Sequence, residues 1–466
     1  MDTSAAPGAT GRSSGPRQLA LVVAILIVVN ALFTSWSTAK EQPGVDFLVY
    51  WSVSQAIESA TSSNKPVDIY SPAGSAAVTD RIATDAANPY LSDRHRAASN
   101  QVLNFEAKSV DVVATPLLFT VLSAWQHDDY PRDLNLHTLC ALLLFAAAVL
   151  ALGRSFGFSP LISLGFLGLF YLGSATLQSD LRIANVNQIQ LFTIAAVIAL
   201  LSKPGRYRDI GAGAVLGLSI MFRPSVALAA VLLLAVWLIH RKPSKAGRLL
   251  SGIAVGVVAA LGISAAYFGT LTCWSDWLRY APGVLASKSD RGKGGLNYGN
   301  YGVSAVVNEL TATNISGIPY GVLVILLVVF GVLTWRSRLR TPLQIGDSTD
   351  PTFFLTATAI SLGVVFALLS STLVWFHYLL MALPAIMLAC AISFNRTVFF
   401  AGRGAISCYR TAAVCGVLVT LTFPLWALSL PLAVSVTLIN LGVLAVAAVI
   451  LCGVATGSNR TGACCV

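Results

Sequence analysis

Long apolar runs recur along nearly the whole chain, and they constrain its fold more than any other feature. A helix crosses about 30 Å of hydrocarbon in roughly 20 residues. Only 11% of the 466 residues are charged, whereas soluble domains carry about 25%. We read spans near 19–38, 134–152, 160–178, 187–202, 248–268, 318–334, 352–370, 373–393, 405–425 and 431–454. Two shorter or broken segments lie near 110–125 and 209–239.

These runs predict an all-α polytopic membrane protein with about 11 to 13 transmembrane helices, because an open sheet cannot satisfy its backbone in lipid. We expect a single transmembrane domain over 19–454. Residues 1–18 are expected to form a disordered cytoplasmic tail, and 455–466 a second cytoplasmic tail. The 19–38 run has no cleavage site and is interpreted as an uncleaved anchor. The cysteines show neither a disulfide framework nor metal-ligand spacing.

The net charge of +10 is a topology signal, because positively charged loops stay on the cytoplasmic side. Basic clusters follow the runs that end near 202, 239, 334 and 393. This pattern predicts outer-face loops at about 40–111 and 270–317. In the first half of the chain, the number of membrane crossings agrees with the charge pattern only under two conditions. Segment 209–239 must form a hairpin bent at Arg223-Pro224, and segment 110–125 must enter the membrane and leave it on the same side.

The first outer segment, 40–111, holds nine of the twenty acidic residues. Its Val49, Val53 and Ile57 recur at helical spacing. The pair Tyr50-Trp51 suits a water–lipid interface. We therefore expect one or more interfacial helices here, with Tyr50 and Trp51 as candidate sugar- or acceptor-binding residues.

The second outer segment, 270–317, carries Lys288, Arg291 and Lys293, which suit a phosphate. Five glycines between 292 and 302 predict a mobile loop. An ordinary flexible loop with aromatic anchors explains the same residues, and the sequence leaves both interpretations open.

Asp46 is the strongest catalytic candidate, because it is a lone carboxylate shortly after the first span. A carboxylate at the mouth of a membrane cavity is suited to act as a general base. Aspartate is also a preferred helix N-cap. A cap for the 47–60 helix is therefore the alternative interpretation.

Two further ionisable residues fall in or beside apolar runs, where such groups are costly and mark functional sites. His377 is able to accept a proton or contact a phosphate oxygen; the alternative is an interfacial histidine beside Trp375 and Tyr378. Arg223 precedes Pro224, which breaks the helix, and its guanidinium suits a lipid phosphate. A structural salt bridge with Asp180 or Asp209 is the alternative for Arg223.

Amide side chains open the 187–202 span, where Asn187 and Gln188 are candidates for binding sugar hydroxyls. The same amides are equally suited to joining helices. Arg182 lies just before them and is a further candidate for the donor phosphate. The chain has no Asp-x-Asp triplet, no Walker-type phosphate loop and no His-Glu-x-x-His, so we expect no metal site and no cofactor.

The order of these elements resembles glycosyltransferase family 87, the polyprenol-phosphate-mannose-dependent α-mannosyltransferases of the GT-C superfold. The resemblance covers roughly 19–395, with Tyr378 standing where the family often has a second histidine. It rests on motifs at Val45–Trp51, Pro66–Pro72, Ala114–Leu118, Asn187–Gln190, Arg223-Pro224, Gly299–Ser304 and Ser370–His377. Asn300 and Trp375, in the last two motifs, are further candidates for binding the sugar or the acceptor.

The resemblance implies a GT-C-like bundle and transfer of a hexose, most simply mannose, from a polyprenyl-phosphate donor to an acceptor hydroxyl. The acceptor is expected to be a glycan or glycolipid, and nucleic acid is not an expected partner. Transfer is expected to be inverting and metal-independent, on the outer face of the bacterial inner membrane. Asp46 would be the base, and Arg223, His377 and a basic residue of 288–293 would stabilise the leaving phosphate.

A transporter or flippase of a lipid-linked sugar is the main alternative, since it also needs many spans, broken helices and a few buried charges. Transporters often contain an inverted repeat, which this sequence does not display. A polymerase or ligase of the same superfold, which moves a whole glycan, would carry a larger outer domain.

Overall fold

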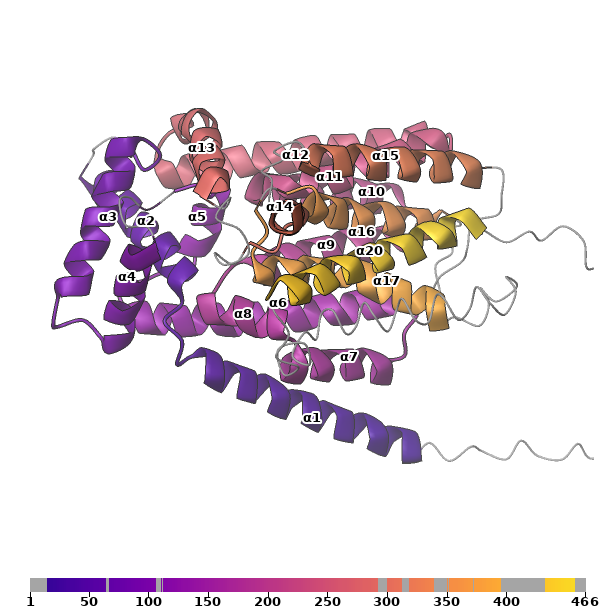
Figure 1. The fold of residues 1–466 in the computed structure, drawn as a ribbon, viewed down its shortest axis with the longest axis horizontal. Helices are drawn as coiled ribbons and strands as arrows, with labels where there is room; N and C mark the ends of the chain where they lie inside the picture. Colours follow the sequence, from indigo (N-terminus) through magenta and orange to yellow (C-terminus); the bar gives the residue numbers. More distant parts are fainter. Residues whose placement is uncertain are drawn as a thin grey trace, which may run out of the picture.

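The computed structural model describes residues 15–63, 67–105, 110, 112–291, 300–311, 318–338, 350, 352–371, 373–394 and 432–456. Helices make up almost all of this described part, and no β-strand is found in it (Figure 1). The helices are α1 Gly15–Ala39, α2 Val45–Ser62, α3 Pro72–Ala87, α4 Asp93–Phe105, α5 Pro116–Ser123, α6 Tyr130–Ser155, α7 Pro160–Gly173, α8 Ala175–Ile183, α9 Asn187–Leu201, α10 Arg206–Phe222, η1 Pro224–Val226, α11 Ala227–Ile239, α12 Pro243–Phe268, α13 Thr272–Arg291, α14 Val303–Thr311, α15 Ile318–Ser337, α16 Phe353–Leu369, η4 Phe376–Ala382, α17 Leu383–Phe394 and α20 Leu432–Thr456.

The expected all-α membrane architecture is confirmed. Within the described ranges, six helices are long and apolar enough to cross a membrane, and a seventh span results if the bent pair α7 and α8 is counted as one. That pair replaces the straight span expected at 160–178, with a bend of 62°. Shorter apolar helices, Asn187–Leu201, Pro224–Ile239 and Phe353–Leu369, account for further expected spans. The run 405–425 lies outside the described residues.

Two hydrophobic cores divide the molecule. The larger core lies in the bundle, where α6, α9, α11, α16 and α17 pack side by side (Figure 1). The smaller core joins helices α2 to α5, which we call the end cap, to the near ends of α12 and α13. The expected helix at 47–60 is confirmed as α2, and it buries Val53 and Ile57 in this second core.

Arg223 follows the last residue of α10 and Pro224 begins η1, so the expected break at this position is confirmed. Two ion pairs mark the far end of the bundle. Asp209, near the start of α10, accepts from Arg248 of α12, and Lys245 pairs with Asp350. Because α10 rises about 1.5 Å per residue over 17 residues, Arg223 lies at the opposite end of the bundle, beside the end cap.

The position of Arg223 depends on close packing between α10 and α12. Each helix carries two glycines four residues apart, Gly213 with Gly217 and Gly252 with Gly256. A Cβ at any of them would collide with a backbone carbonyl of the other helix. Such small-residue pairs let helix backbones approach closely in membranes.

The α10–α12 contact predicts opposite effects for two glycine substitutions in one helix. Gly252→Ala forces a methyl against the carbonyl of Ile210, and overpacking of this kind costs about 1–3 kcal/mol. We expect a lower midpoint of thermal unfolding in detergent.

Gly247→Ala is the matched control, because a Cβ there meets no atom within 4 Å. Alanine in an exposed helical position is favoured over glycine by about 0.5–1 kcal/mol. The control should therefore leave the midpoint unchanged or raise it. Equal midpoints for the two variants would contradict the close contact.

Candidate active site

Asp46 is not a helix cap, and this alternative interpretation is wrong. Helix α2 begins after Gly44, which adopts the left-handed conformation at φ 72° and makes no side-chain cap. The Tyr130 hydroxyl holds this turn by donating to the carbonyls of Pro43 at 2.5 Å and Gly44 at 3.0 Å. A Cβ at position 44 would also press on Leu134, 2.7 Å away. The Asp46 carboxylate therefore does not cap α2, and it contacts a residue outside this helix.

The turn between α8 and α9 supplies the partner of Asp46. Ala184 closes α8 in the left-handed conformation, at φ 53°. Asn185 follows, and its Oδ1 accepts from the backbone N–H of Val186 at 2.8 Å. Its Nδ2 donates to Oδ2 of Asp46. The bend therefore aims an amide at the start of α2.

Arg223 enters the same region from the break between α10 and η1. Proline at 224 has no N–H and cannot continue the helix, so Arg223 leaves it with extended backbone. Thr115, which caps α5, donates its hydroxyl to the carbonyl of Phe222 at 3.0 Å. The end cap thus fixes the residue that precedes Arg223.

Arg223 connects two asparagines and two aspartates in one chain of hydrogen bonds, which we call the amide relay. Its Nη2 donates to Oδ1 of Asn185 at 2.8 Å, and its Nη1 donates to Oδ1 of Asn187. Asn187 in turn donates from Nδ2 to Asp180 Oδ1 at 2.5 Å. The order is Asp46, Asn185, Arg223, Asn187, Asp180.

The two carboxylates set the direction of both amides. A carboxylate only accepts, so the NH₂ group of each asparagine faces an aspartate and its oxygen faces Arg223. In the described structure no direct ion pair joins Arg223 to Asp46, Asp180 or Asp209. Asp209 pairs with Arg248 instead. Arg223 therefore does not form the salt bridge of the alternative interpretation. Asn187 lies between Arg223 and Asp180 and hydrogen-bonds both.

Exposure divides the relay into an accessible rim and a buried layer. Asp46 and Arg223 are half-buried, whereas Asp180, Asn185 and Asn187 are almost fully buried. The rim residues are thus accessible to a substrate. The buried three are suited to hold the rim residues in place.

Two tyrosines complete the rim. The Arg223 guanidinium lies over the Tyr378 ring at 5.2 Å, a cation–π distance. The Tyr50 hydroxyl lies close to both Arg223 and Asp46. Burial and the nearby Asp46 carboxylate raise the pKa of the Tyr50 hydroxyl, so this phenol stays protonated at neutral pH.

His377 precedes Tyr378 in the chain, and its ring packs against the Tyr378 ring. Its ring meets the Tyr378 ring edge-on at 4.6 Å, and its backbone carbonyl accepts from Asn187 Nδ2 at 3.3 Å. The side chain is buried, and its Nε2 has no hydrogen-bond partner among the described residues. An orphaned imidazole nitrogen beside Arg223 is a candidate donor or acceptor for a bound substrate.

Asn300 holds the backbone of the segment that leads to His377. Residues Asn300 and Trp375 form an antiparallel bridge, and Asn300 Oδ1 accepts from the N–H of Val374 at 3.0 Å. Tyr301 N–H donates to the Val374 carbonyl at 2.6 Å. This clamp fixes the segment just before η4, so Asn300 and Trp375 lie next to the His377 segment.

Other expected site residues lie apart from the relay or have other partners. Trp51 donates to the buried Asp133 at 3.1 Å. Arg182 is exposed on another face of α8 and lines a separate cavity with α1. Gln188 is buried and contacts Asp180. Asn187 already uses its oxygen and its NH₂ group within the protein, as the helix-joining alternative predicted.

The basic loop residues are not placed relative to the site. The structure describes the backbone of Lys288 and Arg291 at the end of α13 but not their side chains, and Lys293 lies outside the described residues. Sequence reasoning did not select Asp180, Asn185 or Tyr378 as site residues. For two of them the sequence holds a clue, since Asp180 is a possible salt-bridge partner of Arg223 and Asn185 stands two residues before Asn187.

The chain was compared with known protein families. It matches glycosyltransferase family 87 over residues 114–348, half of its length. The chain belongs to glycosyltransferase family 87. No curated protein and no solved structure matches it. The matched region contains Asp180, Asn185, Asn187 and Arg223, whereas Asp46 and His377 lie outside it.

Family 87 membership identifies the chain as a multi-pass membrane glycosyltransferase and favours transfer over the transporter alternative. It also requires a sugar donor and an acceptor. Four of the five relay residues, Arg223 among them, lie within the matched region, so the region that carries the family match also builds most of the relay.

The amide relay predicts that Arg223 stabilises the fold. In Arg223→Met, two aspartates remain without the cation, the Asn187 oxygen loses its donor, and the Asn185 oxygen keeps only the Val186 N–H. Hydrogen bonds to a charged group contribute about 1.5–3 kcal/mol, and we expect a loss of about 2 kcal/mol because Arg223 is half-buried. The measurement is the midpoint of thermal unfolding in detergent.

Arg132→Met provides the control, since Arg132 of α6 is exposed and its side chain has no hydrogen bond or ion pair with any described residue. Exposed substitutions of this kind change stability by about 0.5 kcal/mol at most. If both variants unfold at the wild-type temperature, the relay does not contribute to stability.

Proposed function

We propose that this glycosyltransferase moves a hexose, most simply mannose, from a polyprenyl-phosphate donor to an acceptor hydroxyl. The observation that carries the proposal is the accessible rim, where one carboxylate and one guanidinium are held apart by a single amide, that of Asn185. Transfer from a lipid phosphate needs a base for the acceptor and a cation for the leaving group. The rim offers one of each.

Asp46 is the base in this proposal. As the acceptor oxygen attacks the anomeric carbon, its proton passes to the Asp46 carboxylate. The bond from the anomeric carbon to the phosphate oxygen breaks in the same displacement, and the electron pair leaves with the polyprenyl phosphate. A single displacement inverts the anomeric configuration. One base suffices, because a phosphate leaving group needs no proton.

Arg223 and Tyr50 stabilise the departing phosphate in this scheme. An arginine has five N–H donors, and the relay uses one from each Nη, which leaves others for phosphate oxygens. The two asparagines are neutral, so the guanidinium keeps its full charge for the phosphate. The Tyr50 hydroxyl and the His377 ring are suited to contact the same phosphate or the sugar.

We place the reaction on the outer face of the bacterial inner membrane. The basic residues Arg206, Lys245 and Arg248 lie at the bundle end opposite Arg223, where the two ion pairs join α10, α12 and Asp350. Positively charged ends face the cytoplasm, which supports an outward orientation for the rim. The acceptor in this proposal is a glycan or glycolipid, and no metal takes part.

Asp46→Asn tests the base directly. The amide cannot take the acceptor proton, and loss of a general base typically lowers a rate by about 10²–10⁴-fold. The assay follows radiolabelled mannosyl phosphopolyprenol and a membrane-lipid extract with purified protein, with and without EDTA.

Asp93→Asn serves as the control, because Asp93 is an exposed carboxylate of the end cap, outside the relay. It should transfer at the wild-type rate. Activity in Asp46→Asn equal to that of Asp93→Asn would refute the base assignment, and inhibition by EDTA would refute metal-independent transfer.

Arg223→Gln tests the phosphate contact. Replacing a charged donor costs about 1.5–3 kcal/mol, so we expect the apparent KM for the donor to rise about 10-fold or more. The KM for the acceptor should change much less. Arg132→Gln, at an exposed arginine of α6, should leave both constants unchanged. A donor KM that does not respond to Arg223→Gln would assign this arginine to structure alone.

A further inference from the structure

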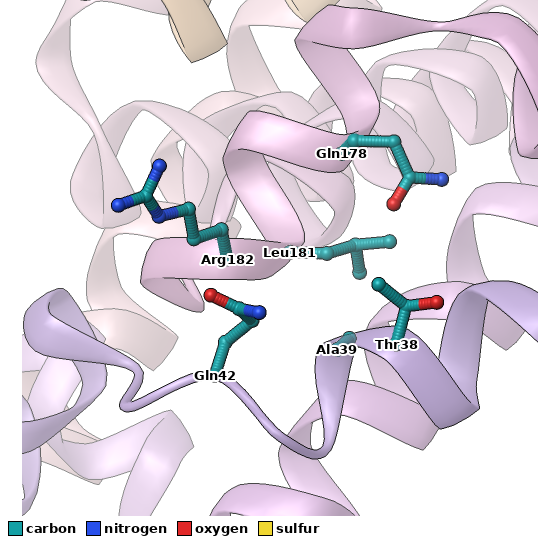
Figure 2. A pocket seen from close by; sticks show the side chains of 6 residues that line it. All are labelled: Thr38, Ala39, Gln42, Gln178, Leu181 and Arg182. Carbon is teal, nitrogen blue, oxygen red and sulfur yellow. The ribbon is translucent and has the colours of Figure 1, made fainter.

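A separate cavity lies between the last turn of α1 and helix α8. It has a volume of about 230 Å³. The polar side chains around it come from the end of α1, from the segment that follows α1 and from α8 (Figure 2). The lining residues are Thr38, Ala39, Gln42, Gln178, Leu181 and Arg182.

Arg182 is the only charged residue of this lining. It is exposed, and none of the described residues pairs or hydrogen-bonds with its guanidinium. No carboxylate lines the cavity. A guanidinium without a protein partner, beside uncharged amide and hydroxyl groups, is chemically suited to a phosphate oxygen.

The C-terminal end of α1, which carries the negative end of the helix dipole, lies beside the cavity, but Arg94 compensates its effect on a bound anion. A helix C-terminus disfavours negative charge because its last carbonyls are unsatisfied. Arg94 of the end cap offsets this effect, since it donates to the carbonyls of Ala39 at 3.2 Å and Gln42 at 2.6 Å. The polar end of α1 thus carries a second cation close to the cavity.

The surroundings of the cavity belong to the membrane surface. Helix α1 exposes apolar side chains along its length, among them Leu26, Val29 and Phe33. At its end, Lys40 lies over the Trp36 ring at 5.4 Å, an aromatic and basic pair typical of the headgroup region. The cavity therefore sits where an acyl chain along α1 would end in its phosphate.

We propose that this cavity binds the phosphate headgroup of a bilayer phospholipid, with Arg182 as its main contact. Residues two apart on a helix point about 200° apart. Asp180 accordingly faces the amide relay while Arg182 faces the cavity. The bound lipid would brace α8 from outside. The proposal concerns binding alone and does not depend on the transfer reaction.

The test measures lipid retention by native mass spectrometry of the delipidated full-length protein in neutral detergent. One arm adds dioleoyl phosphatidylglycerol, and a matched arm adds dioleoylglycerol, which lacks the phosphate. We expect retention of the phospholipid alone. One lost basic contact weakens binding of an anionic lipid about fivefold, so Arg182→Gln should retain about fivefold less phosphatidylglycerol, and Arg182→Lys should retain more than Arg182→Gln.

Two controls make the result specific. Arg132→Gln removes the same charge from an exposed helix position that lines no described cavity, and it should retain phosphatidylglycerol like the wild type. Wild-type retention in Arg182→Gln would overturn the proposal, as would an equal loss in Arg132→Gln.

A third arm separates the bilayer lipid from the donor lipid. Polyprenyl phosphate is added in competition with phosphatidylglycerol. If it displaces the phospholipid from the wild type and Arg182→Gln loses both lipids, the cavity is a donor site and the bilayer-lipid proposal is overturned. If phosphatidylglycerol stays bound, the proposal stands, whatever the outcome of the transfer assays with Arg223→Gln.

Discussion

The structure of this glycosyltransferase depends on how it accommodates the charge of Arg223 at the end of a membrane bundle. A guanidinium is costly to bury unless its donors are satisfied. Two asparagine oxygens meet that need, and each asparagine is oriented by an aspartate on its other side. Helices α2, α8, α9 and α10 must all end or begin at this point for the hydrogen bonds to form.

Charged side chains are paired directly at one end of the bundle and are separated by amides at the other. At the far end, Arg248 meets Asp209 and Lys245 meets Asp350 directly, and these contacts neutralise both partners. At the rim, an amide stands between Arg223 and each carboxylate. A direct ion pair would occupy both the Asp46 carboxylate and the Arg223 guanidinium. The intervening amides hold the groups in place and leave Asp46 and Arg223 half-buried, where a substrate is able to meet them.

Backbone contacts far from the charges determine where Arg223 lies. The paired glycines of α10 and α12 bring these helices together at close distance. Thr115 fixes the last carbonyl of α10, and the bridge between Asn300 and Trp375 fixes the segment that leads to His377. The motifs that contain Thr115, Asn300 and Trp375 thus fix the backbone next to the relay, although these residues are not part of the relay. Their order along the chain is informative because each one anchors a different helix end.

Local sequence features predicted the helical membrane fold and the break at Arg223-Pro224, and both are confirmed. These follow from local properties, namely apolar length, the missing proline N–H and the cost of charge in lipid. Only the packed helices show that Gly44, not Asp46, caps α2, that Asp180 and Asn185 join the amide relay, and that Arg182 faces a separate cavity. Residues 180 and 182 differ only in which face of one short helix they occupy, and packing chooses that face.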